Sequence, residues 1–208
     1  MITFGWSLRQ FVNSVDYLTD DVFEAIKTLT HDYLLRDDGF GACYFSVLRP
    51  GKKVDGDDTL EIVWSSDSNT EANVVRLYGD DSKSIPSLRA FAYRNKRPIW
   101  IMGKNRNKLN AENNQLENFW PWPTGDQSDN EALPKYIHMH SDDAYTFIAA
   151  PLRNLTIDLG LLVIEFSSVI PHNSTAQEEV ELIRESCSQL IWLHDITQER
   201  ERKEPEPL

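Results

Sequence analysis

The sequence is poor in cysteine and in long apolar runs. Its 208 residues include two cysteines, Cys43 and Cys187, and no CxxC pair, which argues against a disulfide scaffold and a structural zinc site. No apolar run approaches the roughly 20 residues that cross a bilayer. The start, MITFGWSLRQF, lacks the features of a signal peptide. These absences predict a soluble, cytoplasmic protein that does not bind membranes.

Basic residues are also scarce. The chain has 21 Lys and Arg against 33 Asp and Glu, a formal net charge of −12. A surface of this sign repels nucleic acid, so we expect no nucleic-acid partner. Two basic clusters stand out, RNKR at 94–97 and KNRNK at 104–108. Solvated loop charge is the preferred interpretation of both, and contact with an anionic partner is the alternative.

Familiar catalytic patterns are missing as well. The sequence has no GxSxG, P-loop or HExxH motif and no glycine-rich phosphate cradle. We therefore predict no catalytic residue and no enzyme activity. The best metal candidate is His138-Met-His140 followed by Asp142-Asp143, since alternate residues of an extended chain point the same way. The pattern is short and more typical of a polar rim around a binding site, so we assign no metal, and the cofactor stays unknown.

Hydrophobic spacing indicates the secondary structure. Apolar residues at intervals of three and four predict helices over 8–18 and 22–34, the first being an N-terminal extension over 1–19. Alternating residues then predict strands at 42–48, 59–66, 73–78 and 97–102, with a helix over 87–96 between the last two.

The last third contains the strongest patterns. Strands are expected at 145–152 and 159–167, joined by residues 153–158, and the second is apolar on both faces, as in a central strand. A capping box at Ser174 or Thr175 opens a helix that is expected to end near His194. Residues 196–208 are predicted to form a charged flexible tail, which leaves a single domain over 1–195. The order of elements indicates an α+β fold with an antiparallel sheet.

Residues 103–144 are too long for an ordinary connection. They are polar, with a short helix expected near 109–119, yet they contain NFWPWP at 118–123. Pro121 and Pro123 exclude a regular helix and a central strand there. The three large aromatic residues of this stretch either fill a minor core, line a ligand site or bind a partner.

Several patches together resemble the GAF family of small-molecule sensor domains. They are SLRAFAYRNKRPIWI at 87–101, TFIAAPL at 146–152, and LGLLVIEF at 159–166 with Gly160 in the glycine position of the family. The resemblance implies a central antiparallel sheet of about six strands. It also implies N- and C-terminal helices on one face of the sheet and a loop-covered pocket on the other.

In that family the segment before the TFIAAPL-like strand folds over the pocket. The resemblance thus implies a small-molecule ligand, with pocket residues Trp100, Phe119, Trp120, Trp122 and Tyr145 and polar contacts Arg89, His138 and His140. Members that attach a bilin or reduce methionine sulfoxide use cysteines in the pocket segment, and residues 44–186 here have none. The cyclic-nucleotide motif is matched only at Asn107-Lys108 and Phe119. The ligand therefore stays unidentified.

The resulting expectation is a sensory or regulatory domain that signals through its terminal helices and forms a homodimer. The alternative is a GAF-like interaction module without a ligand, whose aromatic loop and acidic face bind a protein partner.

Overall fold

The computed structural model describes residues 42–66, 74–78, 87–103, 116–118, 144–170 and 172–203. The two helices expected in the first 36 residues lie outside these ranges. Within the described ranges, no helix is long and apolar enough to cross a membrane.

The centre of the fold is an antiparallel sheet of seven strands, in the order β3-β2-β1-β7-β6-β4-β5. The predicted α+β class is confirmed, and the last predicted strand, apolar on both faces, is central. The strands are β1 (Ala42–Pro50), β2 (Thr59–Ser65), β3 (Val74–Arg76), β4 (Ile99–Gly103), β5 (Leu116–Asn118), β6 (Thr146–Asn154) and β7 (Ile157–Phe166).

One prediction for the long connection was wrong. Residues 116–118 form the edge strand β5, where the sequence suggested a short helix. β5 pairs with β4 through partners such as Met102 and Glu117. The backbone N–H and C=O groups of β5 find partners along the edge of β4. This pairing depends on a distant segment, so local helix propensity does not predict it.

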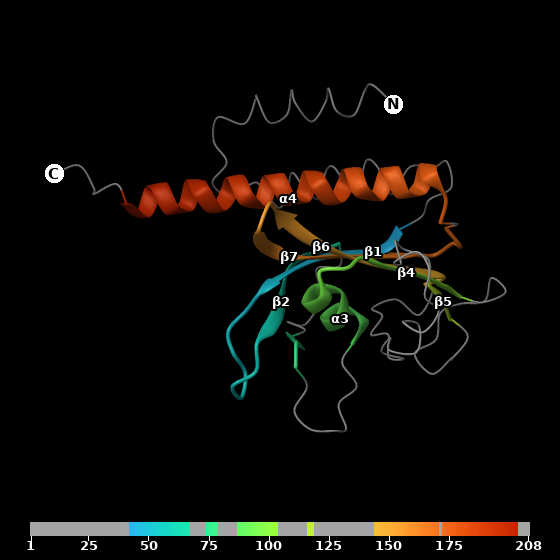
Figure 1. Cartoon of the computed structure of the whole chain (residues 1–208), viewed down its shortest axis with the longest axis horizontal. Coiled ribbons are helices and arrows are strands. Elements are labelled where there is room, and N and C mark those ends of the chain that lie inside the picture. Colours follow the sequence, from blue (N-terminus) through green and yellow to red (C-terminus); the bar gives the residue numbers. More distant parts are fainter. Residues whose placement is uncertain are drawn as a thin grey trace.

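Helices cover the two faces of the sheet. Helix α4 (Ser174–Lys203) lies along one face, and the short helix α3 (Leu88–Asn95) lies on the other, as Figure 1 shows. We call these the α4 face and the α3 face. The predicted C-terminal helix on one face of the sheet is therefore present.

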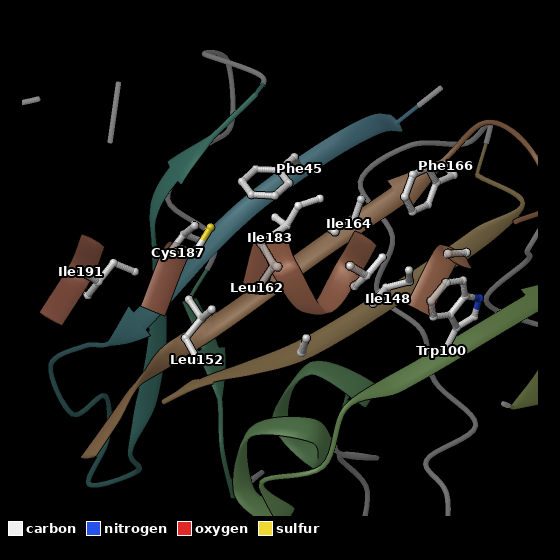
Figure 2. Close-up of a cluster of buried hydrophobic side chains, with 14 of the residues drawn as sticks. Phe45, Trp100, Ile148, Leu152, Leu162, Ile164, Phe166, Ile183, Cys187 and Ile191 are labelled. Carbon is white, nitrogen blue, oxygen red and sulfur yellow. The ribbon is translucent and has the colours of Figure 1, made fainter. Parts of the chain in front are cut away.

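The α4 face has its own hydrophobic core. Alternate residues of β1, β4, β6 and β7 pack with the apolar stripe of α4, and Figure 2 shows side chains from both. The helix expected after the capping box thus packs its apolar stripe on the sheet. The buried members include Phe45, Val47, Trp100, Ile148, Leu162, Ile164, Phe166, Val180, Ile183, Cys187, Leu190 and Ile191.

A second core lies under α3. It uses the intervening residues of the same strands, because successive side chains of a strand point to opposite faces. Its buried members are Leu48, Leu60, Leu77, Leu88, Ala90, Ala92, Ile99, Ile101, Phe147, Ala149, Leu161 and Val163.

The ends of α4 differ from the predicted ones. Asn173 caps the helix, since its Oδ1 accepts from the N–H of Ala176 at 3.0 Å, and Ser174 is already helical. The helix then continues past His194 to Lys203. Arg and Glu favour helix, and the strong break, Pro205, comes only two residues later.

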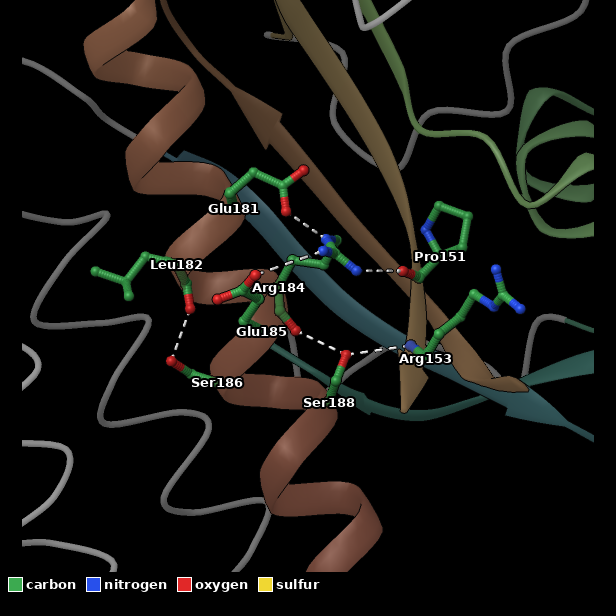
Figure 3. A network of polar contacts seen from close by, with 8 residues as sticks. All are labelled: Pro151, Arg153, Glu181, Leu182, Arg184, Glu185, Ser186 and Ser188. Atoms are coloured by element: carbon green, nitrogen blue, oxygen red, sulfur yellow. Dashed lines mark hydrogen bonds and ion pairs between the residues drawn. The ribbon is translucent and has the colours of Figure 1, made fainter. Parts of the chain in front are cut away.

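Polar contacts fasten α4 to the sheet (Figure 3). The Arg184 guanidinium donates to the carbonyl of Pro151 at 3.4 Å, and the Ser188 Oγ accepts from the N–H of Arg153 at 3.2 Å. Farther along, Arg49 of β1 donates two hydrogen bonds to Asp195, at 2.9 and 2.6 Å. The helix is thus tied to β6 and β1 as well as packed on them.

β7 requires a glycine where it passes β1. Gly160 has φ +150°, and a Cβ there would lie 2.1 Å from the Leu48 carbonyl oxygen. The ladder between β6 and β7 is irregular at Leu152–Arg153, next to this glycine. Only glycine lets the two backbones approach this closely without displacement.

Candidate ligand site

Helix α3 carries a buried cation in its first turn. Ser87 caps the helix by accepting from the N–H of Ala90 at 3.2 Å, and Lys96 ends it in the left-handed conformation. Arg89 is 1% exposed. A positive charge in the first turn opposes the helix dipole. Neither burial nor helix position favours an arginine here, so its environment must compensate.

Glu165 of β7 provides that compensation. Its Oε1 lies 3.4 Å from the Nη2 of Arg89, and its side chain is 0% exposed. In the sheet Glu165 pairs with Tyr44 of β1 and Phe147 of β6. Burying two charges costs several kcal/mol per ion, which their attraction offsets only in good geometry. Such a pair is therefore weak evidence for stability.

Ser46 adds a second polar group to the α3 face. It lies two residues from Tyr44 on β1 and pairs with Val163 of the second core. The residue is 0% exposed. Among the residues that the structure describes, its Oγ has no hydrogen-bond partner. A buried hydroxyl in that state is destabilising unless something else bonds to it.

The structure places three of the eight predicted ligand residues. Arg89 lies on the α3 face. Tyr145 directly precedes β6 and is half-buried, and strand alternation assigns it to the face of Phe147. Trp100 lies on the opposite face, in the core under α4. The other five, Phe119, Trp120, Trp122, His138 and His140, lie outside the described residues.

Trp100 connects β4 to the start of α4. Its Nε1–H donates to the carbonyl of Ile170 at 3.3 Å, and its ring contacts that of His172 edge-on, with centroids 5.1 Å apart. Burial lowers the pKa of His172. The segment is also held by Thr146, whose Oγ1 accepts from the N–H of Ile170 at 2.9 Å. The connection from β7 to α4 is thus anchored on β4 and β6.

Sequence reasoning missed Glu165 and Ser46. A signal for Glu165 was present, because it is the single charged residue in LGLLVIEF, a strand apolar on both faces. A carboxylate at such a position needs a buried partner. Ser46 carried no comparable signal, since serine is common in strands that are half exposed. In the described ranges, no group of three or more His, Cys, Asp or Glu residues is placed to hold a metal ion.

Comparisons with known proteins give matches in structure alone. No family model matches the sequence, and no curated protein is similar to it. Among solved structures, the GAF domain of a two-component sensor histidine kinase from Bacillus halodurans superposes with a TM-score of 0.52 and 11% identity. The match covers 86% of this chain and 97% of that one. The chain has a GAF-like fold.

Two further GAF-like structures differ in function from that domain. Free methionine-R-sulfoxide reductase from Neisseria meningitidis, in complex with its substrate, gives a TM-score of 0.55 at 9% identity, covering 91% of this chain and 87% of that one. The phycocyanobilin-bound GAF domain of a cyanobacterial phytochrome gives 0.51 at 13% identity, covering 92% and 93%. Because the GAF-like fold serves such different proteins, function has to be argued from the site.

Proposed function

We propose that this chain is a sensory or regulatory domain that binds a small molecule on the α3 face and signals through its terminal helices. The observation that carries the proposal is that Arg89, Glu165 and Ser46 bring buried polar atoms to the α3 face, within a largely apolar core. A ligand with donors and acceptors would bond the Ser46 hydroxyl. The aromatic residues Phe119, Trp120 and Trp122 would cover it, with Tyr145, His138 and His140 around them.

In this proposal β4 carries the signal. Its residues Ile99 and Ile101 belong to the core under α3, while Trp100 between them is bonded to the segment that leads into α4. A ligand that favours one position of β4 would therefore shift Trp100 and the start of α4. Such coupling requires that β4 have two positions and that the ligand bind the protein with a different affinity in each. Trp100 then acts as a transmitting residue on the far side of the sheet.

We also propose that the domain is not an enzyme. The only cysteines are Cys43 and Cys187. Cys187 is fully buried, and burial raises its pKa to about 12. A thiol in that state is a poor nucleophile, because the thiolate is the reactive form. A reductase mechanism based on Cys187 is therefore disfavoured.

The terminal helices are proposed to form a homodimer. Helix α4 has 30 residues, about 45 Å at the rise of an α-helix. Its apolar residue Trp192 is only partly buried against the first core, which leaves part of the ring available to a second copy. Light scattering on the purified chain would measure the dimer. Replacing Trp192 with Glu should then give a monomer, and a mass that is unchanged by this substitution would contradict the interface.

Native mass spectrometry tests the ligand. The purified chain should carry a small adduct that leaves on denaturation and can then be identified. The same compound, added back, should raise Tm. Trp120→Ala and Trp122→Ala should abolish both effects with the fold intact. The control is Tyr78→Ala, which removes an aromatic ring that is 54% exposed and lies under Arg94 of α3. A bare mass together with no Tm response to a metabolite library would contradict the proposal.

One observation favours a second candidate, an interaction module without a ligand. Arg89 and Glu165 are closed off from solvent, at 1% and 0% exposure, as in a finished core. In that case the two tryptophan substitutions would leave Tm unresponsive to every metabolite and would weaken binding to a protein partner.

A further inference from the structure

The hairpin between β6 and β7 ends in an unusual turn. Asn154 pairs with Ile157, so Leu155 and Thr156 alone form the loop, shorter than the 153–158 connection expected from the sequence. Leu155 is 91% exposed and has φ +54°, and Ile157 is 52% exposed. We call Leu155 and Ile157 the hairpin tip.

Leucine at this position is unfavourable in two ways. Two-residue hairpin loops with positive φ at the first central residue favour Gly, Asn or Asp. A leucine there is strained because its Cβ approaches the following carbonyl. It also exposes almost its whole apolar side chain to water. No contact in the described part of the chain requires leucine at 155, and an observed outlier of this kind points to function.

The hairpin tip lies beside a cluster of basic residues. Asp158, one residue after the tip, lies 2.9 Å from the Nζ of Lys96 and 3.0 Å from the Nε of Arg153. Lys96 belongs to the RNKR cluster that the sequence singled out. Lys96, its cluster neighbours Arg94 and Arg97, and Arg153 are here called the basic rim.

This local charge is opposite to that of the whole chain. Two of the rim's four cations, Lys96 and Arg153, are paired with the same carboxylate, Asp158, whereas the full sequence has a net charge of −12. Arg94, Lys96 and Arg97 are exposed. Arg94 also lies over the ring of Tyr78, 4.4 Å from its centroid, so an exposed aromatic ring borders the rim. Apolar and cationic side chains thus share one end of the sheet.

We propose that the hairpin tip and the basic rim form a docking surface for an acidic protein segment with an apolar pocket. The pocket would accept Leu155, and its carboxylates would pair with Lys96 and Arg153. The proposal goes beyond the ligand site and does not depend on it, since none of these residues lies in the polar group at Arg89. Complementary charge would raise the association rate and the specificity for this partner, and burial of Leu155 would supply most of the affinity.

The charges favour a protein over other occupants. A chain of net charge −12 is repelled by anionic lipids and by nucleic acid. A second copy docked symmetrically would place one basic rim against another, because the same patch faces itself across a two-fold axis. A short acidic segment meets the rim alone rather than the whole chain, and unlike a phosphate backbone or a lipid headgroup it can supply an apolar pocket for Leu155.

The test begins with crosslinking in the cells that make the protein. The photoreactive residue benzoylphenylalanine replaces Leu155 in the full chain, and a parallel chain carries it at Val63, an exposed residue of β2. A protein crosslinked only through position 155 is identified and purified. Its Kd for the wild-type chain is then measured by fluorescence anisotropy at low and high NaCl.

We expect Leu155→Asn to weaken that binding about tenfold or more, as for a central interface residue. Lys96→Glu should weaken it too, and added salt should do the same. Lys53→Glu is the control, since Lys53 lies on the β1–β2 loop and is paired with Asp58. Equal crosslinking from positions 155 and 63 would overturn the proposal, as would a crosslink to a second copy or to lipid. A Kd that Leu155→Asn leaves unchanged would also overturn it.

Discussion

Arg89 and Glu165 face each other across the α3 side of the sheet, with Nη2 and Oε1 3.4 Å apart and both side chains buried. The pair joins the first turn of α3 to the central strand β7. Two opposite charges in an apolar layer are seldom the most stable solution for a core. They are a polar feature that the fold maintains at a cost on the α3 face.

Removing one partner of this pair should be severe. Arg89→Met or Glu165→Met removes one charge of the buried pair and its attraction to the other, and each should lower the free energy of unfolding by about 3–5 kcal/mol. The double substitution should recover most of that loss, because two apolar side chains of similar length replace both charges. Urea denaturation of the four proteins measures the coupling.

The same series separates structure from function. The double variant should be folded and yet fail to bind the ligand found by native mass spectrometry, if the polar group recognises it. Arg153→Met is the control for loss of a partly exposed ion pair and should cost less than about 1 kcal/mol. Equal losses for Arg89→Met and Arg153→Met would refute the argument from burial.

Gly160 should tolerate no side chain. In Gly160→Ala the new Cβ would lie 2.1 Å from the Leu48 carbonyl oxygen, a backbone atom that moves only with β1. We expect a loss of stability of about 2–4 kcal/mol, as for strain at a constrained backbone site. Gly56→Ala is the matched control, since Gly56 has φ +86° but nothing within 4 Å of its added Cβ. Thermal unfolding should rank Gly160→Ala well below Gly56→Ala, and the reverse order would contradict this account.

The strongly patterned parts of the fold could be predicted from the sequence. TFIAAPL and LGLLVIEF have the apolar pattern of buried strands and lie at the centre of the sheet, and the expected C-terminal helix packs the residues from Val180 to Leu190 on it. The spacing of apolar residues is visible within a short window of sequence, so the type of element and its buried face can be predicted from that window. β5 could not be found this way, because its strand state comes from pairing with β4.

The site was less predictable for a related reason. Arg89 was selected from a resemblance, but its partner Glu165 is 76 residues away, and nothing local fixes which cation a buried carboxylate meets. Trp100 was expected in a pocket, and one-residue alternation along β4 decides which face of the sheet it joins. A slip of one residue reverses that assignment, so the face of a single side chain depends on the register of the whole sheet.

Leu155→Asn should make the protein more stable. Asparagine accepts positive φ more readily than leucine and is a common turn residue. We expect the free energy of unfolding to rise by about 0.5–1 kcal/mol, measured by urea denaturation. Thr156→Asn, at the other loop position and without positive φ, should give no gain. A stabilised chain that has lost its acidic partner would show that leucine serves binding; lower stability would mean that Leu155 supports the fold.

Cys187 should make stability depend on alkaline pH. Burial raises its pKa from 9.0 to about 12 in the folded state, while the unfolded thiol ionises near its ordinary value. Between these two values the unfolded state binds fewer protons than the native one, so stability falls as pH rises. The slope from this residue has an upper limit of about 1.4 kcal/mol per pH unit. Unfolding in urea at pH 8.5, 9.5 and 10.5 should therefore show a steeper decline for the wild type than for Cys187→Ala. Tyr and Lys residues titrate equally in both proteins and cancel in the difference. An equal loss of stability with pH in the two proteins would contradict this prediction. It would mean that the Cys187 thiol ionises in the native state as readily as in the unfolded one.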